Sequence, residues 1–119
     1  MNYADSFLIQ CKENYFKKIT PANKNSRGTK EYEHLVLIAK DWFKKGILSE
    51  FAGFFLEGQY FVALWAAHLI VEYSNQDSFK KEAIEVIKDY SGNPLAPKVA
   101  DEELQWLKDN YFLYKNYFN

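Results

Sequence analysis

The sequence predicts an all-α fold, a single domain (residues 1–119) built as a bundle of about six helices. Apolar residues recur at three- and four-residue steps through most of the chain, and one stretch is apolar on every side. No segment shows the alternating pattern or the paired turn signals of a β-hairpin. With 119 residues, 48% of them hydrophobic, the chain is long enough to bury one core and too apolar to be disordered.

The predicted fold is organised around residues 60–73, YFVALWAAHLIVEY, whose apolar side chains cover nearly the whole circumference of a helix. Such a helix either lies in the middle of a bundle or spans a membrane. A helix of about 14 residues is roughly 21 Å long, whereas a membrane span needs about 20 apolar residues. We therefore expect a buried central helix over about 60–73 and no membrane span.

The first part of the chain predicts two helices separated by a loop. Apolar spacing places the first helix at about residues 4–19, and Pro21 ends it, because proline disfavours helical geometry in the residue before it. Residues 20–29 are rich in Asn, Ser, Gly and Lys, as loops are. Thr29 is the expected N-cap of the second helix, and Gly46 is its expected C-terminal glycine.

Three more helices complete the predicted bundle. They are expected at residues 48–56, at about 79–90, and from Pro97 almost to the terminus. The spacing in the last helix predicts that its inward residues are Ala100, Leu104, Leu107 and Tyr111.

Charge is unevenly distributed along the chain. Residues 1–48 carry nine basic and five acidic side chains, a net charge of +4, whereas residues 49–119 carry six and eleven, a net charge of −5. Such a chain can offer an acidic face to a basic partner, although an asymmetric solvated surface explains the distribution equally well. Arg27 is the only arginine, and because arginine is the preferred contact to phosphate and guanine, we expect no nucleic-acid partner.

The sequence carries no motif for catalysis or for metal binding, so we expect no enzyme activity, no metal and no cofactor. His34 and His68 lack partners at metal-ligand spacing, and the apolar neighbours of His68 favour a hydrogen-bonded core or edge residue. Cys11 lies on an apolar face and is expected to be structural; as the only cysteine it has no internal disulfide partner. Because residues 1–10 do not resemble a signal peptide, we expect a cytoplasmic protein. An enzyme would require Cys11, His34 or His68 to converge with carboxylates in a pocket.

From Trp42 to Leu107 the chain reads helix, glycine, short helix, glycine, FVALWAAHLIVEY, a capped helix and VADEELQWL. This order resembles small bacterial helical-repeat domains of the HEAT/armadillo kind, in which helix hairpins stack and an alanine pair, here Ala66 and Ala67, lets helices approach closely. It is similar in particular to an uncharacterised bacterial family of that fold, whose closing helix is matched here by Ala100, Leu104 and Trp106. The shared positions are packing positions, so no catalytic residue is carried over, and the chain shows no clear internal repeat.

Similar short helical proteins act as immunity partners of bacterial polymorphic or contact-dependent growth-inhibition toxins. The resemblance implies a protein that covers the active cleft of a basic toxin domain, most naturally a nuclease, since a protein that grips RNA or DNA must be basic. The residues expected to bind this partner are Glu57, Glu72, Asp101, Glu102, Glu103, Tyr111 and Tyr114. Acids at the start of the last helix also complement its dipole, and tail aromatics also cover cores. The alternative is a helical scaffold or regulatory module that binds a protein unrelated to toxins.

Overall fold

The computed structural model describes residues 2–118 and contains, within them, α-helices and short 3₁₀ helices but no strand. The predicted all-α fold is therefore confirmed. The α-helices are α1 (Tyr3–Phe16), α2 (Lys30–Lys44), α3 (Leu48–Ala52), α4 (Val62–Tyr73), α5 (Lys80–Ser91) and α6 (Pro97–Tyr114). The 3₁₀ helices are η1 (Ser26–Gly28), η2 (Gly53–Leu56) and η3 (Lys115–Tyr117).

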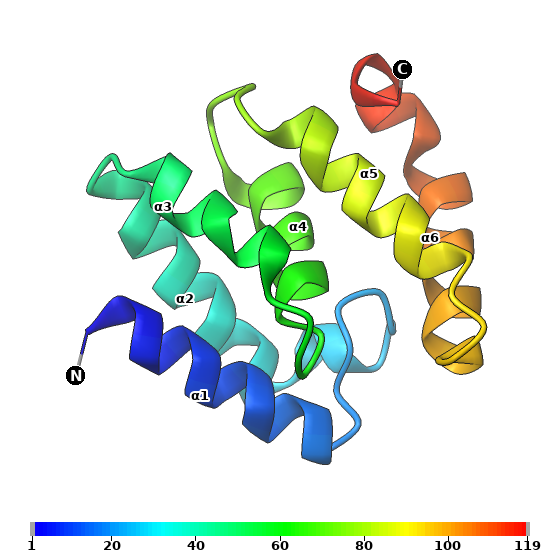
Figure 1. The fold of residues 1–119 in the computed structure, drawn as a ribbon, viewed down its shortest axis with the longest axis horizontal. Coiled ribbons are helices and arrows are strands. Elements are labelled where there is room, and N and C mark those ends of the chain that lie inside the picture. Colours follow the sequence, from blue (N-terminus) through cyan, green and yellow to red (C-terminus); the bar gives the residue numbers. More distant parts are fainter. Residues whose placement is uncertain (1, 119) are drawn as a thin grey trace.

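Helix α4 lies in the middle of the molecule, as predicted. Helices α1, α2 and α3 lie on one side of it, and α5 and α6 lie on the other (Figure 1). Every residue from Val62 to Val71 is buried, His68 included. Among residues 2–118, no helix has both the length and the apolar character that crossing a membrane requires.

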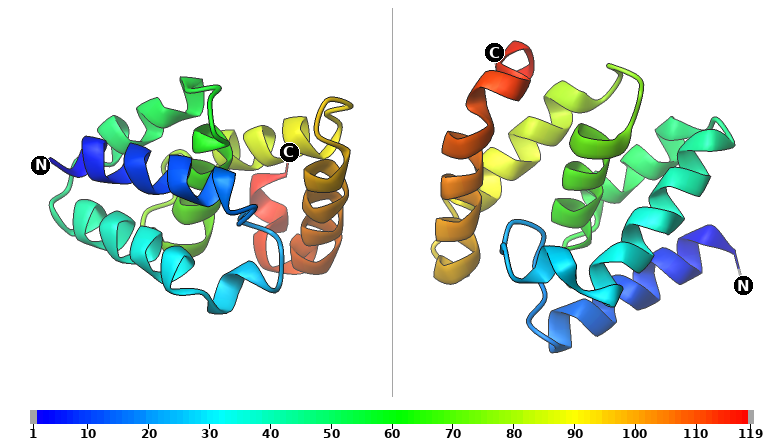
Figure 2. Two further views of the ribbon diagram at one scale, coloured as in Figure 1. Left: turned by 90° about the horizontal axis from the view of Figure 1, so that it is seen from below. Right: turned by 180° about the vertical axis from the view of Figure 1, so that it is seen from behind.

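Two parts of the chain position the residues discussed below: the segment between α1 and α2, and helix α6. The segment between α1 and α2 passes between α2 and α6, which are otherwise apart in the view from behind (Figure 2). Helix α6 packs chiefly on α5 and forms one edge of the molecule. One long face of α6 is therefore left to solvent.

The predicted ends of α2 are confirmed. The backbone N–H of Tyr32 donates to Thr29 Oγ1 at 3.2 Å, which satisfies one of the free donors in the first turn. Gly46 follows the helix with φ +87°, a left-handed conformation that glycine adopts without steric cost.

The predicted end of α1 is wrong by three residues, because the helix stops at Phe16 rather than near Ile19. Lys18 has φ +60°, and the N–H groups of Lys18 and Ile19 donate to the carbonyls of Tyr15 and Asn14. This pair of hydrogen bonds is a Schellman motif, which normally carries glycine at the left-handed position. Lysine occupies that position here, so the usual sequence signal is missing.

The predicted inward face of α6 is also partly wrong. Ala100 and Leu107 are buried, but Leu104 and Tyr111 are 43% and 44% exposed. The buried residues of α6 are Val99, Ala100, Glu103, Trp106 and Leu107. The helix is thus rotated so that a glutamate faces the interior and two large apolar side chains face outward.

Two glycines, Gly46 after α2 and Gly53 after α3, supply a test of the left-handed conformation at Gly46. Replacing Gly46 by alanine should lower the free energy of unfolding by about 1 kcal/mol, because alanine disfavours φ +87° while its Cβ meets no atom within 4 Å. Gly53, with φ −57° and an equally open site, is the matched control: Gly53→Ala should be neutral or stabilise by about 0.5 kcal/mol. Urea unfolding measures both. Equal effects of the two substitutions would contradict the left-handed assignment of Gly46.

Candidate partner-binding site

Four charged side chains form what we term the buried charge network: His68 and Glu103, which are buried, and Arg27 and Glu72, which are partly exposed. His68, only 2% exposed, donates from Nε2 to Glu103 Oε1 at 2.6 Å and from Nδ1 to Glu72 Oε2 at 2.9 Å. Arg27 donates to both oxygens of Glu72, at 2.5 and 2.9 Å. The network therefore joins the loop before α2 to α4 and α6.

The charges of this network balance when His68 is protonated. Burial alone would lower the pKa of His68, but the attraction of Glu103, together with the hydrogen bonds to Glu103 and Glu72, raises it to about 9. Burial would raise the pKa of Glu72, but the hydrogen bonds from His68 and Arg27 outweigh it and lower that pKa. At neutral pH two cations thus face two carboxylates.

Aromatic rings enclose the network. Trp106 packs edge-on against His68, with ring centres 4.6 Å apart, and the Arg27 guanidinium lies 5.2 Å from the centre of the Tyr32 ring. Arg27 Nε also donates to the carbonyl of Pro21 at 2.9 Å. In this low-dielectric setting, removing one partner and leaving its opposite charge buried typically destabilises by about 3–5 kcal/mol.

The predicted acidic group at residues 101–103 is divided by the structure. Glu103 is completely buried in the network, so it does not face a partner. Glu102 is half-buried and accepts hydrogen bonds from Thr20 Oγ1 and Asn23 Nδ2, at 2.6 and 2.7 Å. Asp101 is exposed. Consecutive helical residues point in different directions, and only Asp101 points outward.

The other predicted acidic residues are also engaged within the protein. Glu72 belongs to the buried charge network. Glu57 is half-buried, and its Oε1 accepts the backbone N–H of Gln59 at 3.2 Å in the turn before α4. Neither Glu72 nor Glu103 is available as a surface contact in this arrangement.

The two predicted aromatic contacts differ in position. Tyr111 is partly exposed and packs edge-on against Phe112 and Phe118. Tyr114 is half-buried and stacks on Trp106, with ring centres 5.7 Å apart and planes 12° apart. Tyr111 therefore belongs to the surface, whereas Tyr114 covers the ring that encloses the network.

From Asp101 onward, the exposed residues of α6 gather into one surface, which we term the outer face of α6. It comprises Asp101, Leu104, Gln105, Lys108, Asp109, Tyr111, Phe112 and Leu113. Phe112 is 84% exposed and lies three turns from Asp101 on the same line along the helix. Asp101 and Asp109 alternate along this face with the large apolar residues, which are Leu104 and then Tyr111, Phe112 and Leu113. This combination matches partner-binding surfaces, where a few large side chains carry most of the affinity.

The residues expected from the sequence to bind a partner included Tyr111 but not Phe112, Leu113 or Asp109, because the apolar spacing turned the Leu104 side of the helix inward. The sequence did contain one indication of the buried charge network. His68 and Glu72 are four residues apart on one helix, a spacing at which side chains meet. Burial of this helix leaves the second ring nitrogen of His68 in need of a hydrogen-bond partner from a neighbouring element. Glu103 meets that need and fixes the rotation of α6.

The histidines and the cysteine occupy separate settings. His34 is exposed and its Nδ1 lies 2.6 Å from Gln10 Oε1, whereas Cys11 is buried and burial raises the pKa of its thiol. Within residues 2–118, no three His, Cys, Asp or Glu side chains are arranged to hold a metal ion.

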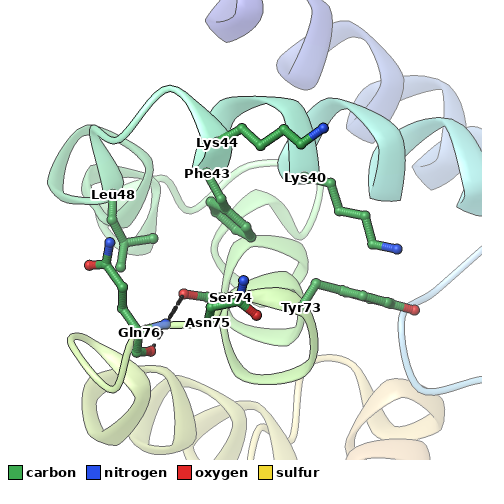
Figure 3. A pocket seen from close by; sticks show the side chains of 8 residues that line it. All are labelled: Lys40, Phe43, Lys44, Leu48, Tyr73, Ser74, Asn75 and Gln76. Atoms are coloured by element: carbon green, nitrogen blue, oxygen red, sulfur yellow. Dashed lines mark hydrogen bonds between the residues drawn. The ribbon is translucent and has the colours of Figure 1, made fainter.

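A basic hollow of about 350 Å³ lies between α2 and the turn after α4 (Figure 3). Lys40 and Lys44 come from α2, and Asn75 and Gln76 come from the turn, with the ring of Phe43 pointing in between them. The Lys40 ammonium lies 5.3 Å from the centre of the Tyr73 ring. The polar side chains of this hollow therefore lie around the rings of Phe43 and Tyr73.

No family model, curated protein sequence or solved structure matches this chain. The inference of function then rests on the chain's own residues.

The raised pKa of His68 predicts a pH dependence of stability. Its folded pKa, about 9, exceeds the ordinary value of 6.5, so its contribution is fully present below pH 6.5 and is lost as the pH rises toward 9. The free energy of unfolding, measured by urea denaturation, should fall by about 3 kcal/mol across this interval. His68→Gln should be less stable at pH 6 and nearly insensitive to pH between 6.5 and 9.

His34→Gln is the control for this prediction, since His34 is exposed and lies outside the network. That variant should keep the full pH dependence of the wild-type protein. A His68→Gln variant with the wild-type slope would show that another group is responsible.

Proposed function

We propose that this protein is a non-enzymatic binding protein that holds a basic protein domain on the outer face of α6. The observation that carries the proposal is the orientation of α6. The buried charge network directs Glu103 inward, and Leu104, Tyr111, Phe112 and Leu113 are left exposed beside Asp101 and Asp109.

The composition of this face supports a protein partner. Phe112 and Tyr111 offer large, rigid rings, the residue type that most often forms the energetic centre of an interface. Asp101 and Asp109 lie on this face with Lys108, and Lys98 is exposed one turn before Asp101. Carboxylates placed around apolar anchors favour a basic partner, speed its association and help to set its specificity.

The partner we propose is a bacterial toxin domain, with this chain acting in the cytoplasm as its immunity protein. A nuclease suits the acidic residues best, because its substrate groove must be basic. Inhibition would follow from occlusion: a helix anchored by buried ion pairs covers the cleft and keeps nucleic acid out. The alternative is a scaffold that binds an unrelated protein through the same face. In that case the partner should not be toxic to cells.

Purification of the tagged protein together with the product of the gene beside its own tests this proposal. A one-to-one complex with a neighbour that kills cells when expressed alone would support immunity. A complex with a harmless neighbour would favour the scaffold, and the absence of any complex with that neighbour would remove the toxin proposal.

Charge reversal on the outer face of α6 should weaken the complex. The double variant Asp101→Lys, Asp109→Lys should lose roughly tenfold or more in affinity, mainly through slower association, because two attractive contacts become repulsive. Phe112→Ala should raise the dissociation rate. Surface plasmon resonance separates the two effects. The variants should keep the fold, since all three side chains are exposed.

The double variant Glu33→Lys, Glu82→Lys is the matched control, because it changes the net charge equally at exposed positions on α2 and α5. It should bind within about twofold of the wild-type protein. Equal weakening by both double variants would mean that net charge, and not the outer face of α6, governs binding.

A further inference from the structure

A cluster of five aromatic rings lies where the end of α1 meets the start of α4, apart from the outer face of α6. We term it the aromatic groove, and its rings are Tyr15, Phe16, Tyr60, Phe61 and Tyr90. The ring of Tyr15 lies 5.4 Å, centre to centre, from each of Phe16, Tyr60 and Phe61. Phe16 is 67% exposed. These rings support one another while remaining open to solvent.

The turns around the groove contain residues in unfavourable backbone conformations, which the surrounding structure imposes. Within residues 2–118, four residues other than glycine have a left-handed φ, and three of them lie here: Lys18 at +60°, Tyr60 at +52° and Phe61 at +56°. Hydrogen bonds from Val62 N–H to Gln59 O and from Ala63 N–H to Glu57 O, at 2.9 and 3.2 Å, close the turn. Conformations of this kind cluster at ligand-binding sites, where the surrounding structure imposes them.

Two adjacent hollows open onto these rings. The first, of about 380 Å³, is lined by Phe16, Val99, Lys18 and Lys98, and the second, of about 490 Å³, by Tyr60, Tyr90 and Leu95 among others. Tyr15 and Phe61 line both. Each hollow has room for a large side chain.

The charges around the groove are positive on balance. Lys18 and Lys98 line the first hollow, and the Lys12 ammonium lies 5.6 Å from the centre of the Tyr60 ring. In the part of the chain that the structure describes, none of these lysines forms an ion pair with a carboxylate. Glu102 also lines the first hollow, but both its oxygens accept hydrogen bonds from Thr20 and Asn23. Apolar walls beside free cations suit a ligand that is apolar and anionic.

We propose that the aromatic groove binds an acidic peptide segment through one aromatic anchor residue. The anchor ring enters the first hollow and contacts Phe16 and Phe61, and the flanking carboxylates pair with Lys18, Lys98 and Lys12. This site includes Lys98 at the start of α6, and it does not depend on the partner proposed for the outer face of α6.

Fluorescein-labelled five-residue peptides test the assignment. The first peptide carries a central tryptophan flanked by four glutamates, and the others carry four glutamines or four lysines instead. Fluorescence anisotropy in low salt should show saturable binding of the glutamate peptide below about 1 mM, roughly tenfold tighter than the glutamine peptide. The lysine peptide should not bind. Equal binding of the three peptides, or no saturable binding of the glutamate peptide, would overturn the proposal.

Variants of the intact protein locate the site. Phe16→Ala, and the double variant Lys18→Asn, Lys98→Gln, should each weaken the glutamate peptide roughly tenfold, because they remove ring contact and charge respectively. Asparagine tolerates the left-handed backbone at position 18. The double variant Lys40→Gln, Lys44→Gln alters the basic hollow of Figure 3 instead and should bind normally.

A control oligonucleotide separates peptide from nucleic acid, since aromatic rings and lysines also hold single strands. A five-nucleotide oligothymidine that bound more tightly than the glutamate peptide would overturn the peptide assignment. Loss of peptide binding in the Lys40, Lys44 double variant, with binding retained in the aromatic-groove variants, would also overturn it by moving the site to the other hollow.

Discussion

A histidine and a glutamate lie inside this protein, and a second glutamate and an arginine, both partly exposed, join them to the surface. His68 occupies the middle of the buried helix α4, Glu72 follows it by one turn, and Glu103 reaches it from α6. Burying ions is unfavourable unless each meets an opposite charge in good geometry. Because α6 supplies one of these ions, its rotation about its own axis is set by an electrostatic requirement rather than by the apolar pattern alone.

That rotation links the interior to the surface. With Glu103 and Trp106 directed toward α4, the opposite side of α6 must carry Leu104 and Phe112, which a purely hydrophobic packing would have covered. An exposed apolar stripe on a monomeric protein generally marks an interaction surface. The contact between Glu103 and His68, which stabilises the interior, thus also explains why aromatic side chains of α6 are exposed.

Much of the fold could be predicted from the sequence because its signals are local. The apolar stretch of α4, the Thr29 cap and Gly46 each act within a few residues, and each prediction is confirmed. The end of α1 was missed because Lys18 takes a position that glycine usually fills. The roles of Glu103 and Arg27 were missed because they depend on contacts 35 and 45 residues apart in the chain, which no local pattern encodes.

Hydrogen exchange of a Glu103→Gln variant would test most directly whether the buried charge network holds α6. Glutamine keeps the size of the side chain and removes its charge. The amides of α6 should then exchange at least about tenfold faster than in the wild-type protein, whereas those of α1 and α2 should change little. Unchanged exchange in α6, or an equal loss of protection in every helix, would contradict the view that this network orients α6 and thereby creates its outer face.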